Sequence, residues 1–223
     1  MQKHSLGLIE YYTHGQNPGV LFLSGMHGDE YESGRLLEAW LLSTYSSLPP
    51  FLYIPRVSPS AVQAGTRRNA EHHDINRKFL DHTDDREVRD VMGILSGHTF
   101  TVCLDIHEDP DRTQAFYIYD SSQMTDLERE AYRNTVHKTP FKLYTGIDDI
   151  DDEHLQRHIE KGYVSLQPTD TELSAGFASV WLMKQMISKR AFTIEIPGKA
   201  RPQDKQILLQ NVLPFLLGTF GVQ

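Results

Sequence analysis

Residues 19–30 read GVLFLSGMHGDE, a continuous apolar run that ends in Ser-Gly, with a histidine and two acids among the next five residues. An apolar run without polar alternation predicts a strand that is buried on both faces of a sheet. The next segment, residues 30–44, carries apolar side chains at the spacing of one helix face: Leu36, Leu37, Trp40 and Leu41. A buried strand that leads directly into a helix is typical of an α/β protein.

The same alternation continues along the chain. Further strands are expected at residues 51–57, 99–106, 115–119 and 191–196, and further helices at residues 84–95, 127–137, 180–188 and 202–217. Residues 60–76 are expected to form a polar connection, and the acid-rich residues 148–153 a solvated surface loop. The pattern predicts a three-layer α/β sandwich, with a mixed, largely parallel central sheet flanked by helices, formed by residues 1–223 as a single domain.

Composition restricts the class of partner. The chain has 22 Lys and Arg against 30 Asp and Glu, a formal net charge of −8, which argues against nucleic acid or an anionic membrane as partner. We find no apolar run of membrane-spanning length and no signal-peptide core at the start. A single cysteine, Cys103, excludes an internal disulfide and predicts a reducing compartment, so we expect a cytoplasmic protein.

Candidate metal ligands stand at the ends of the predicted strands. His27 follows the first strand and Glu30 begins the next helix, while His107 comes just after a central strand. Because ligand sites of such sheets lie at the carboxyl ends of the strands, we expect these side chains to meet. Two histidines and one carboxylate would leave the fourth position of a tetrahedral zinc ion open for water. The alternative is that His27 and Glu30 only cap the helix, with Glu30 stabilised by the helix dipole.

Four motifs in a fixed order carry a resemblance to a known family. They are His-x-x-Glu at residues 27–30, the segment GTRRNAEHHDINRKF at residues 65–79, the isolated His107, and Thr-x-Glu-x-Pro at residues 193–197. In this order they resemble the M14 zinc carboxypeptidase clan, which includes the succinylglutamate desuccinylase/aspartoacylase branch. The middle segment is most similar to small bacterial murein-peptide amidase-like members. The resemblance implies the zinc-carboxypeptidase-like fold.

The resemblance also implies roles for the catalytic residues. His27, Glu30 and His107 would hold one Zn²⁺, and a second metal is not excluded. Glu195 would take a proton from the attacking water and pass it to the leaving nitrogen. The alternative for Glu195 is a surface acid on an edge strand. Arg67 resembles the clan arginine that stabilises the oxyanion of the reaction.

Further residues of the middle segment receive supporting roles. Asp74 would hydrogen-bond the far ring nitrogen of His27, although a turn-forming role is the alternative. Asn76 and Arg77 look like the pair that holds a free carboxylate of the substrate, since the planar guanidinium of arginine can bind a carboxylate through two hydrogen bonds. Arg68, next to Arg67, is an alternative for the oxyanion role.

Four residues receive no firm role. His72 and His73 depart from the family pattern and are expected as exposed loop histidines. Glu108 follows His107 and has no role that chemistry alone assigns. Tyr163 is a candidate, by position only, for the tyrosine that the clan places on a flexible loop.

Three functions remain open. The first is a metallocarboxypeptidase that trims a C-terminal residue or a murein-type peptide. The second is an N-acyl amino acid deacylase of the desuccinylase/aspartoacylase type, and the third is a non-catalytic binding protein on the same fold. The peptidase-like strand around Glu195 and the short segment after it favour the first, because the deacylases usually carry an additional C-terminal β-domain. The expected partner is a small peptide or N-acyl amino acid, and the sequence gives no oligomeric state.

Overall fold

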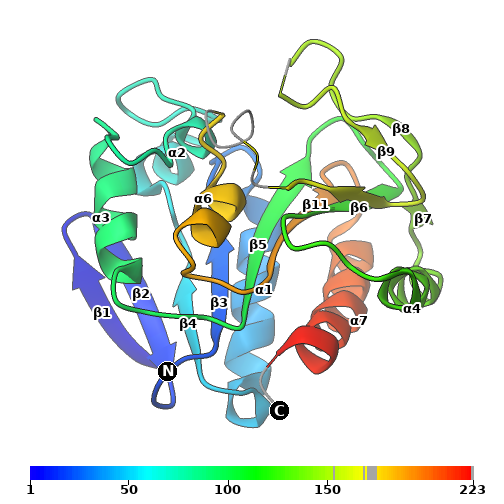
Figure 1. The fold of residues 1–223 in the computed structure, drawn as a ribbon, viewed down its shortest axis with the longest axis horizontal. Helices are drawn as coiled ribbons and strands as arrows, with labels where there is room; N and C mark the ends of the chain where they lie inside the picture. Colours follow the sequence, from blue (N-terminus) through cyan, green and yellow to red (C-terminus); the bar gives the residue numbers. More distant parts are fainter. Residues whose placement is uncertain (153, 168, 170–174, 222–223) are drawn as a thin grey trace.

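One mixed sheet runs through the computed structural model, which describes residues 1–152, 154–167, 169 and 175–221 (Figure 1). The strands in chain order are β1 (Gln2–Leu6), β2 (Ile9–His14), β3 (Val20–Ser24), β4 (Phe51–Ile54), β5 (Val102–Asp109), β6 (Ala115–Asp120), β7 (Lys142–Leu143), β8 (Gly146–Ile147), β9 (His158–Ile159), β10 (Tyr163–Ser165) and β11 (Ala191–Pro197). In space the sheet has the order β1-β2-β4-β3-β5-β11-β6-β10, and β7 also pairs with β6. Strands β8 and β9 form a separate pair.

The centre of the sheet is parallel. Strand β3 pairs in parallel with β4 and β5, and β5 pairs in parallel with β11. Antiparallel pairs stand on both sides of this centre, because β2 runs opposite to β1 and β4, and β6 runs opposite to β11. The predicted mixed, largely parallel sheet is therefore confirmed.

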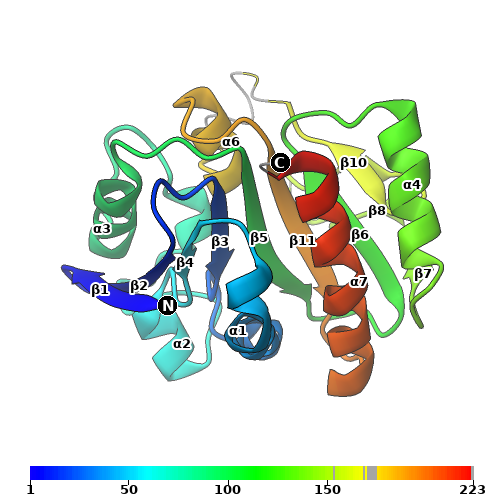
Figure 2. The same ribbon diagram turned by 90° about the horizontal axis from the view of Figure 1, so that it is seen from below.

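Helices cover both faces of the sheet. They are α1 (Tyr31–Thr44), α2 (Pro59–Ala64), α3 (Arg86–Leu95), α4 (Asp126–Val136), α6 (Ala178–Lys184) and α7 (Pro202–Phe220), with two short 3₁₀ helices, η1 (Tyr45–Ser47) and η2 (Ile75–Arg77). Alternate residues of β3 enter different cores: Val20 and Phe22 pack with α1, α4 and α7, whereas Leu21 and Leu23 pack with α3 and α6. Figure 2 shows α3 and α6 across the sheet from α1 and α7. This arrangement is the predicted three-layer sandwich.

The strand predictions need correction in several places, and the strand expected at residues 51–57 ends already at Ile54. Residues 2–14 form the hairpin β1–β2, which was not predicted because most of its side chains are exposed or only half-buried and show no apolar run. Strand β5 ends at Asp109 rather than at residue 106, so His107 lies inside the strand and not after it. The polar residues at its end remain in the ladder because β11 pairs with them up to Pro197.

Two loop predictions were also too simple. The polar connection at 60–76 contains most of α2, whose first turn is capped by the Ser58 side chain, and then η2. The segment 148–153 is not uniformly solvated, since the Asp148 side chain is only 9% exposed and accepts hydrogen bonds from tyrosines. Residue 153 lies outside the described part of the chain.

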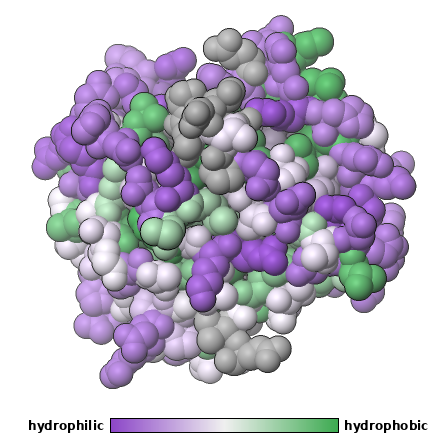
Figure 3. Space-filling view, viewed as in Figure 1, coloured by the Kyte–Doolittle hydropathy of each residue, from purple (hydrophilic) through white to green (hydrophobic). Residues whose placement is uncertain are grey.

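The outer surface is polar. On the face drawn in Figure 3, hydrophilic side chains predominate and apolar ones occur in small separate groups. Within the described residues, none of the helices combines the length and the apolar character needed to cross a membrane.

The loop between β3 and α1 is held by a close backbone approach at Gly28. Its N–H donates to the carbonyl of Thr66 over 2.8 Å, and a Cβ at this position would lie 1.8 Å from the carbonyl oxygen of Ala61. Since that neighbour is a backbone atom and cannot rotate away, only glycine fits at position 28, next to His27.

We therefore expect Gly28→Ala to lower the free energy of unfolding by about 2 kcal/mol or more, measured by urea denaturation. Gly218→Ala is the matched control, because Gly218 lies in α7 with no heavy atom within 4 Å of the added Cβ. That control should be neutral or stabilise the helix by up to about 1 kcal/mol. Equal stability of both variants would contradict the steric role of Gly28.

Candidate metal centre

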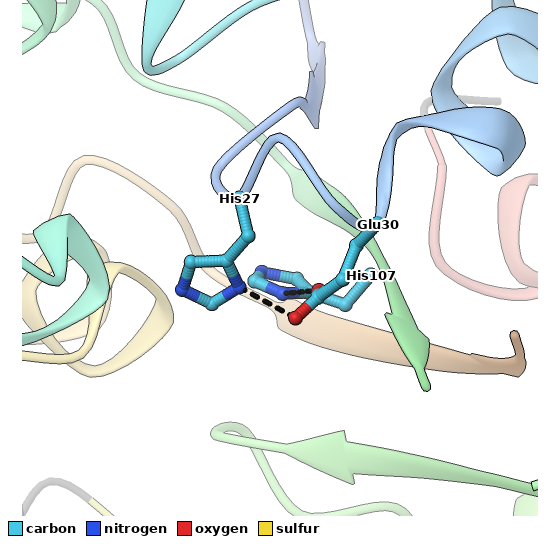
Figure 4. Close-up of side chains that lie close together, drawn as sticks. All are labelled: His27, Glu30 and His107. Carbon is cyan, nitrogen blue, oxygen red and sulfur yellow. Dashed lines mark hydrogen bonds and ion pairs between the residues drawn. The ribbon is translucent and has the colours of Figure 1, made fainter. Parts of the chain in front are cut away.

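Three side chains from three elements meet at the carboxyl end of the central strands (Figure 4). His27 lies in the loop after β3, Glu30 is the residue that precedes the first turn of α1, and His107 lies on β5. Nδ1 of His27 is 2.8 Å from one carboxylate oxygen of Glu30, and Nδ1 of His107 is 3.2 Å from the other. All three side chains are buried. The structure thus brings together the three residues selected from the sequence as ligands.

The register of the sheet places Glu195 beside this group. In the parallel ladder of β5 and β11, Glu195 is the partner of His107, and in the antiparallel ladder of β11 and β6 it is the partner of Tyr117. Paired residues of neighbouring strands point to the same face. His107, Glu195 and Tyr117 therefore form one row across three strands on the floor of a cavity.

Each histidine of the group has a carboxylate at both ring nitrogens. Nε2 of His27 lies 3.1 Å from Asp74, and Nε2 of His107 lies 3.2 Å from Asp105. The contact of His27 with Asp74 is the one that the predicted orienting role requires, whereas Asp105 was not predicted. A neutral imidazole carries one N–H and can donate to only one of two carboxylates. With both carboxylates ionised, each ring therefore needs either a second proton or a metal ion bound at Nδ1.

The pKa values of the metal-free group follow from these contacts. Burial alone would lower the pKa of both histidines, but Glu30 raises that of His27, and Asp105 raises that of His107 well above its ordinary range. Burial would raise the pKa of Glu30, yet the charge of His27 and the hydrogen bond from His107 hold it well below its usual value. Without a metal, both histidines therefore bind a proton more tightly than an ordinary imidazole does.

The donor set fits a zinc ion. Ligand atoms at about 2.0–2.2 Å around a tetrahedral zinc lie about 3.3 Å from one another. Here the two histidine–carboxylate distances are 2.8 and 3.2 Å, and all three ligand atoms lie within 4.8 Å of one another. The carboxylates on the outer ring nitrogens are the usual partners of metal-bound histidines. Three protein ligands leave one position open toward the cavity.

Glu195 combines a partly exposed position with a strongly shifted pKa. Burial raises the pKa of Glu195 well above its ordinary value; the charge of His107 opposes this shift, and that of Glu30 adds to it. The carboxyl group faces the same cavity as the candidate ligands. Glu195 can therefore hold a proton close to any molecule bound there.

Arg67 lies against two acids of the site, whereas Arg68 does not. The Arg67 guanidinium donates to Glu30 over 3.1 Å and to Asp74 over 3.0 Å, and its side chain remains 42% exposed. Arg68 donates to the carbonyl of His72 on the neighbouring loop. This geometry favours Arg67 for the oxyanion role.

Asn76 and Arg77 line the cavity, but both already have protein partners. The side-chain oxygen of Asn76 accepts from the N–H of Ala178 over 3.1 Å. The Arg77 guanidinium lies over the ring of Phe177 at 4.4 Å and forms an ion pair of 2.7 Å with Asp152. A carboxylate is thus already bound where the substrate carboxylate is predicted to bind.

The cavity has a volume of about 720 Å³, and the part of its wall next to Tyr117 consists of residues that the sequence analysis missed. The Tyr117 hydroxyl lies 2.5 Å from a carboxylate oxygen of Asp148 and 2.9 Å from one of Asp109, and the Tyr119 hydroxyl is also hydrogen-bonded to Asp148. Arg112 forms an ion pair of 2.6 Å with Asp109. Burial raises the pKa of Asp148, which the hydrogen bonds from both tyrosines counteract. Only the alternation in residues 115–120, which places Tyr117 and Tyr119 on one face, hinted at this wall.

The remaining candidates lie away from this cavity. His72 is exposed in a left-handed turn. Tyr163 is on β10, where its hydroxyl bonds Asp120 rather than the cavity. His73 is hydrogen-bonded to Asp85 at 2.9 Å and, with the exposed Glu71, forms the only other three-ligand cluster among the described residues.

A sequence model of the family described as "Succinylglutamate desuccinylase/Aspartoacylase catalytic domain" matches residues 16–212. The match spans the ligands, the middle segment and Glu195, and the predicted relationship to this branch is confirmed. A search of curated proteins found no match.

Solved structures share the fold. A candidate metallopeptidase from Shewanella denitrificans superposes with a TM-score of 0.76 at 19% identity, over 99% of this chain and 85% of its own. A metallo-carboxypeptidase from Pseudomonas aeruginosa, in complex with (2-guanidinoethylmercapto)succinic acid, gives 0.64 at 20%, over 96% and 62%. The product-bound ectoine utilization protein EutE from Ruegeria pomeroyi gives 0.58 at 17%, over 94% and 60%. These likenesses show the fold.

Metal affinity should depend on pH in a defined direction. Because the pKa values of His27 and His107 are raised in the metal-free protein, protons compete with the metal more strongly than at ordinary histidines. We expect the apparent zinc affinity to fall by about tenfold or more per unit as the pH is lowered from about 8 to about 6. Competition with a chromophoric chelator measures this, and a pH-independent affinity would contradict the assigned ligands.

Proposed function

Because the chain belongs to the succinylglutamate desuccinylase/aspartoacylase catalytic-domain family, we propose that it is a zinc-dependent hydrolase. Residues 1–223 would act as one catalytic domain that cleaves an amide bond close to a free carboxylate. The family and the carboxypeptidase-like fold support the hydrolase class. The zinc ion, the general base and the substrate are parts of the proposal.

One observation carries the metal part of the proposal. Two buried histidines each have carboxylates at both ring nitrogens, and both turn Nδ1 toward the same carboxylate, that of Glu30. A cation at this point would replace two protons and allow each ring to donate from Nε2 alone. A bound zinc would supply a Lewis acid that polarises the substrate carbonyl and lowers the pKa of water to about 7.

The chain's own residues supply the proton transfers and the binding of charge. Glu195, on the cavity floor beside His107, would take the proton of the attacking water and deliver it to the leaving nitrogen. Its raised pKa makes Glu195 a stronger base than an ordinary carboxylate, as a group that takes a proton from water must be. Arg67 would donate hydrogen bonds to the negative charge that develops on the carbonyl oxygen.

The free carboxylate of the substrate would bind to Arg77. Asp152 occupies this guanidinium through a single ion pair and is itself partly exposed, so a substrate carboxylate can replace it. Asn76, which accepts a hydrogen bond from the backbone of Ala178, would fix the start of α6 beside that carboxylate.

Two substrate classes follow, and they are tested side by side. The family match favours an N-acyl amino acid, whereas the Thr-x-Glu-x-Pro strand at residues 193–197 resembles peptidases and favours a short peptide with a free C-terminus. Small ligands in two structural neighbours, the succinic acid derivative and the EutE product, support a small substrate in either case. The solved structures do not choose between the classes.

The assignment of the base is tested by Glu195→Gln. We expect the variant to keep its zinc and to lose turnover by about 10²-fold or more, because the amide side chain cannot accept the proton. His107→Ala should instead lose the metal. Elemental analysis of the purified variants, combined with a screen of N-acyl amino acids and short peptides, measures both effects.

Full activity of Glu195→Gln would overturn the role of this residue. Absence of metal from the native chain, even after incubation with zinc, would overturn the zinc-dependent function itself. Zinc binding without hydrolysis in either substrate class would favour a binding protein on the same fold.

The carboxylate site is tested by a pair of variants with opposite effects. Arg77→Ala should raise KM by about tenfold or more and change kcat little, because Arg77 binds the ground state and the transition state alike. Asp152→Asn should lower KM by about two- to fivefold, since it removes the competing carboxylate of a partly exposed ion pair. Arg68→Ala is the control with an unchanged KM. An Arg77 variant with a pure kcat defect would contradict this assignment.

A further inference from the structure

We infer that Glu108 and Lys205 are positioning residues for the metal ligand Glu30. This inference rests on the proposed zinc-dependent function, because it concerns the affinity of the same site. Neither residue contributes an atom to the candidate ligand set. They act behind it, where strand β5 and helices α1 and α7 meet.

Helix α1 starts with an unusual cap. Its N-cap residue is Glu30, but the Glu30 side chain makes no capping hydrogen bond, because its oxygens face the two histidines. The carboxylate of Glu108, from the neighbouring strand β5, accepts a hydrogen bond from the N–H of Ser33 in the first turn instead. An acid at this end of a helix is stabilised by the helix dipole. Glu108 thus replaces the cap that Glu30 cannot supply.

The backbone of Glu108 contacts the ligand itself. Its N–H donates to a carboxylate oxygen of Glu30 over 3.3 Å, and this is the oxygen that also faces His107. Glu108 therefore touches both the carboxylate of Glu30 and the helix turn that carries it. A shift of Glu108 would therefore move the Glu30 carboxylate relative to His107, the residue that precedes Glu108 in the chain.

Lys205 holds Glu108 in place. Its ammonium group lies 2.8 Å from the second oxygen of Glu108 and 2.6 Å from Glu32, and its side chain is 0% exposed. A buried charge requires a partner, and removing one member of a buried pair leaves the other without compensation. Glu108 is 5% exposed, whereas Glu32 is 46% exposed and can turn to water. The Lys205–Glu108 contact is therefore the essential one.

The sign of the effect separates positioning from simple electrostatics. Lys205 is positive and lies behind a cation site, so a purely long-range effect of its removal would strengthen metal binding. A positioning role predicts weaker metal binding. Without Lys205, the Glu108 carboxylate would move from the helix end toward solvent, and Glu30 would no longer be held in place. Partners that orient metal ligands typically change affinity by about 10–100-fold when they are removed.

The test uses the Lys205→Met variant, prepared without metal and with its fold verified by circular dichroism. Its zinc dissociation constant is then measured by competition with a chelator. We expect affinity to weaken by about 10–100-fold and the visible spectrum of the cobalt-loaded form to change. Glu32→Gln is the matched control, since it removes only the exposed partner, and should change affinity by less than about threefold. The double variant Lys205→Met/Glu108→Gln should recover part of the loss, because no uncompensated buried charge remains.

Unchanged or tighter zinc binding by Lys205→Met, beside a native chain that binds zinc tightly, would overturn the inference and leave the proposed function intact. A native chain without zinc affinity would overturn the function and, with it, the inference. If Lys205→Met does not fold, Glu108→Gln decides: native affinity and an unchanged cobalt spectrum in that variant would overturn the inference, and weakened affinity would support it.

Discussion

The buried carboxylate of Glu30 is the constraint on which the rest of the site depends. Both of its oxygens face histidines, one from the loop after β3 and one from β5, so the start of α1 is tied to two neighbouring strands. A buried charge is tolerated only when its partners are fixed in place. The outer carboxylates Asp74 and Asp105 fix the rings, and the close packing at Gly28 fixes the loop. Fold and site are therefore determined together.

The sequence alone predicts the three layers of the fold and the three side chains that meet at the site, His27, Glu30 and His107. Apolar runs such as residues 20–24 identify the buried strands, and the rule that ligand sites lie at strand ends then selects His27 and His107. The same rule misplaced the end of β5, because it places His107 after the strand, whereas β5 continues to Asp109. Tyr117 escaped notice because its role follows from the register of β6 against β11, which no local pattern contains.

Long-range partners were out of reach for a physical reason. Lys205 and Glu108 are 97 residues apart, and a lysine in the first turns of a helix normally extends into water. Lys205 is buried in the structure, where α7 packs beside α1 and the ammonium group contacts Glu32 of α1 and Glu108 of β5. Conversely, Asp148 belongs to a run of acids for which the sequence predicts a solvated loop. In the structure its carboxylate is hydrogen-bonded to the hydroxyls of Tyr117 and Tyr119 and lies in the cavity wall.

Positive and negative side chains both line the cavity around Glu195. Arg67, Arg77 and Arg112 each pair with an acid, and the charges of Asp148 and Asp109 add to the burial that raises the pKa of Glu195. Burial and these acids make Glu195 a stronger base than an ordinary carboxylate, although the charge of His107 opposes this shift of its pKa. A general base needs a pKa close to the working pH. A cation bound beside His107 would favour the ionised carboxylate, so metal binding at the proposed site would also adjust Glu195 for its proposed role as the base.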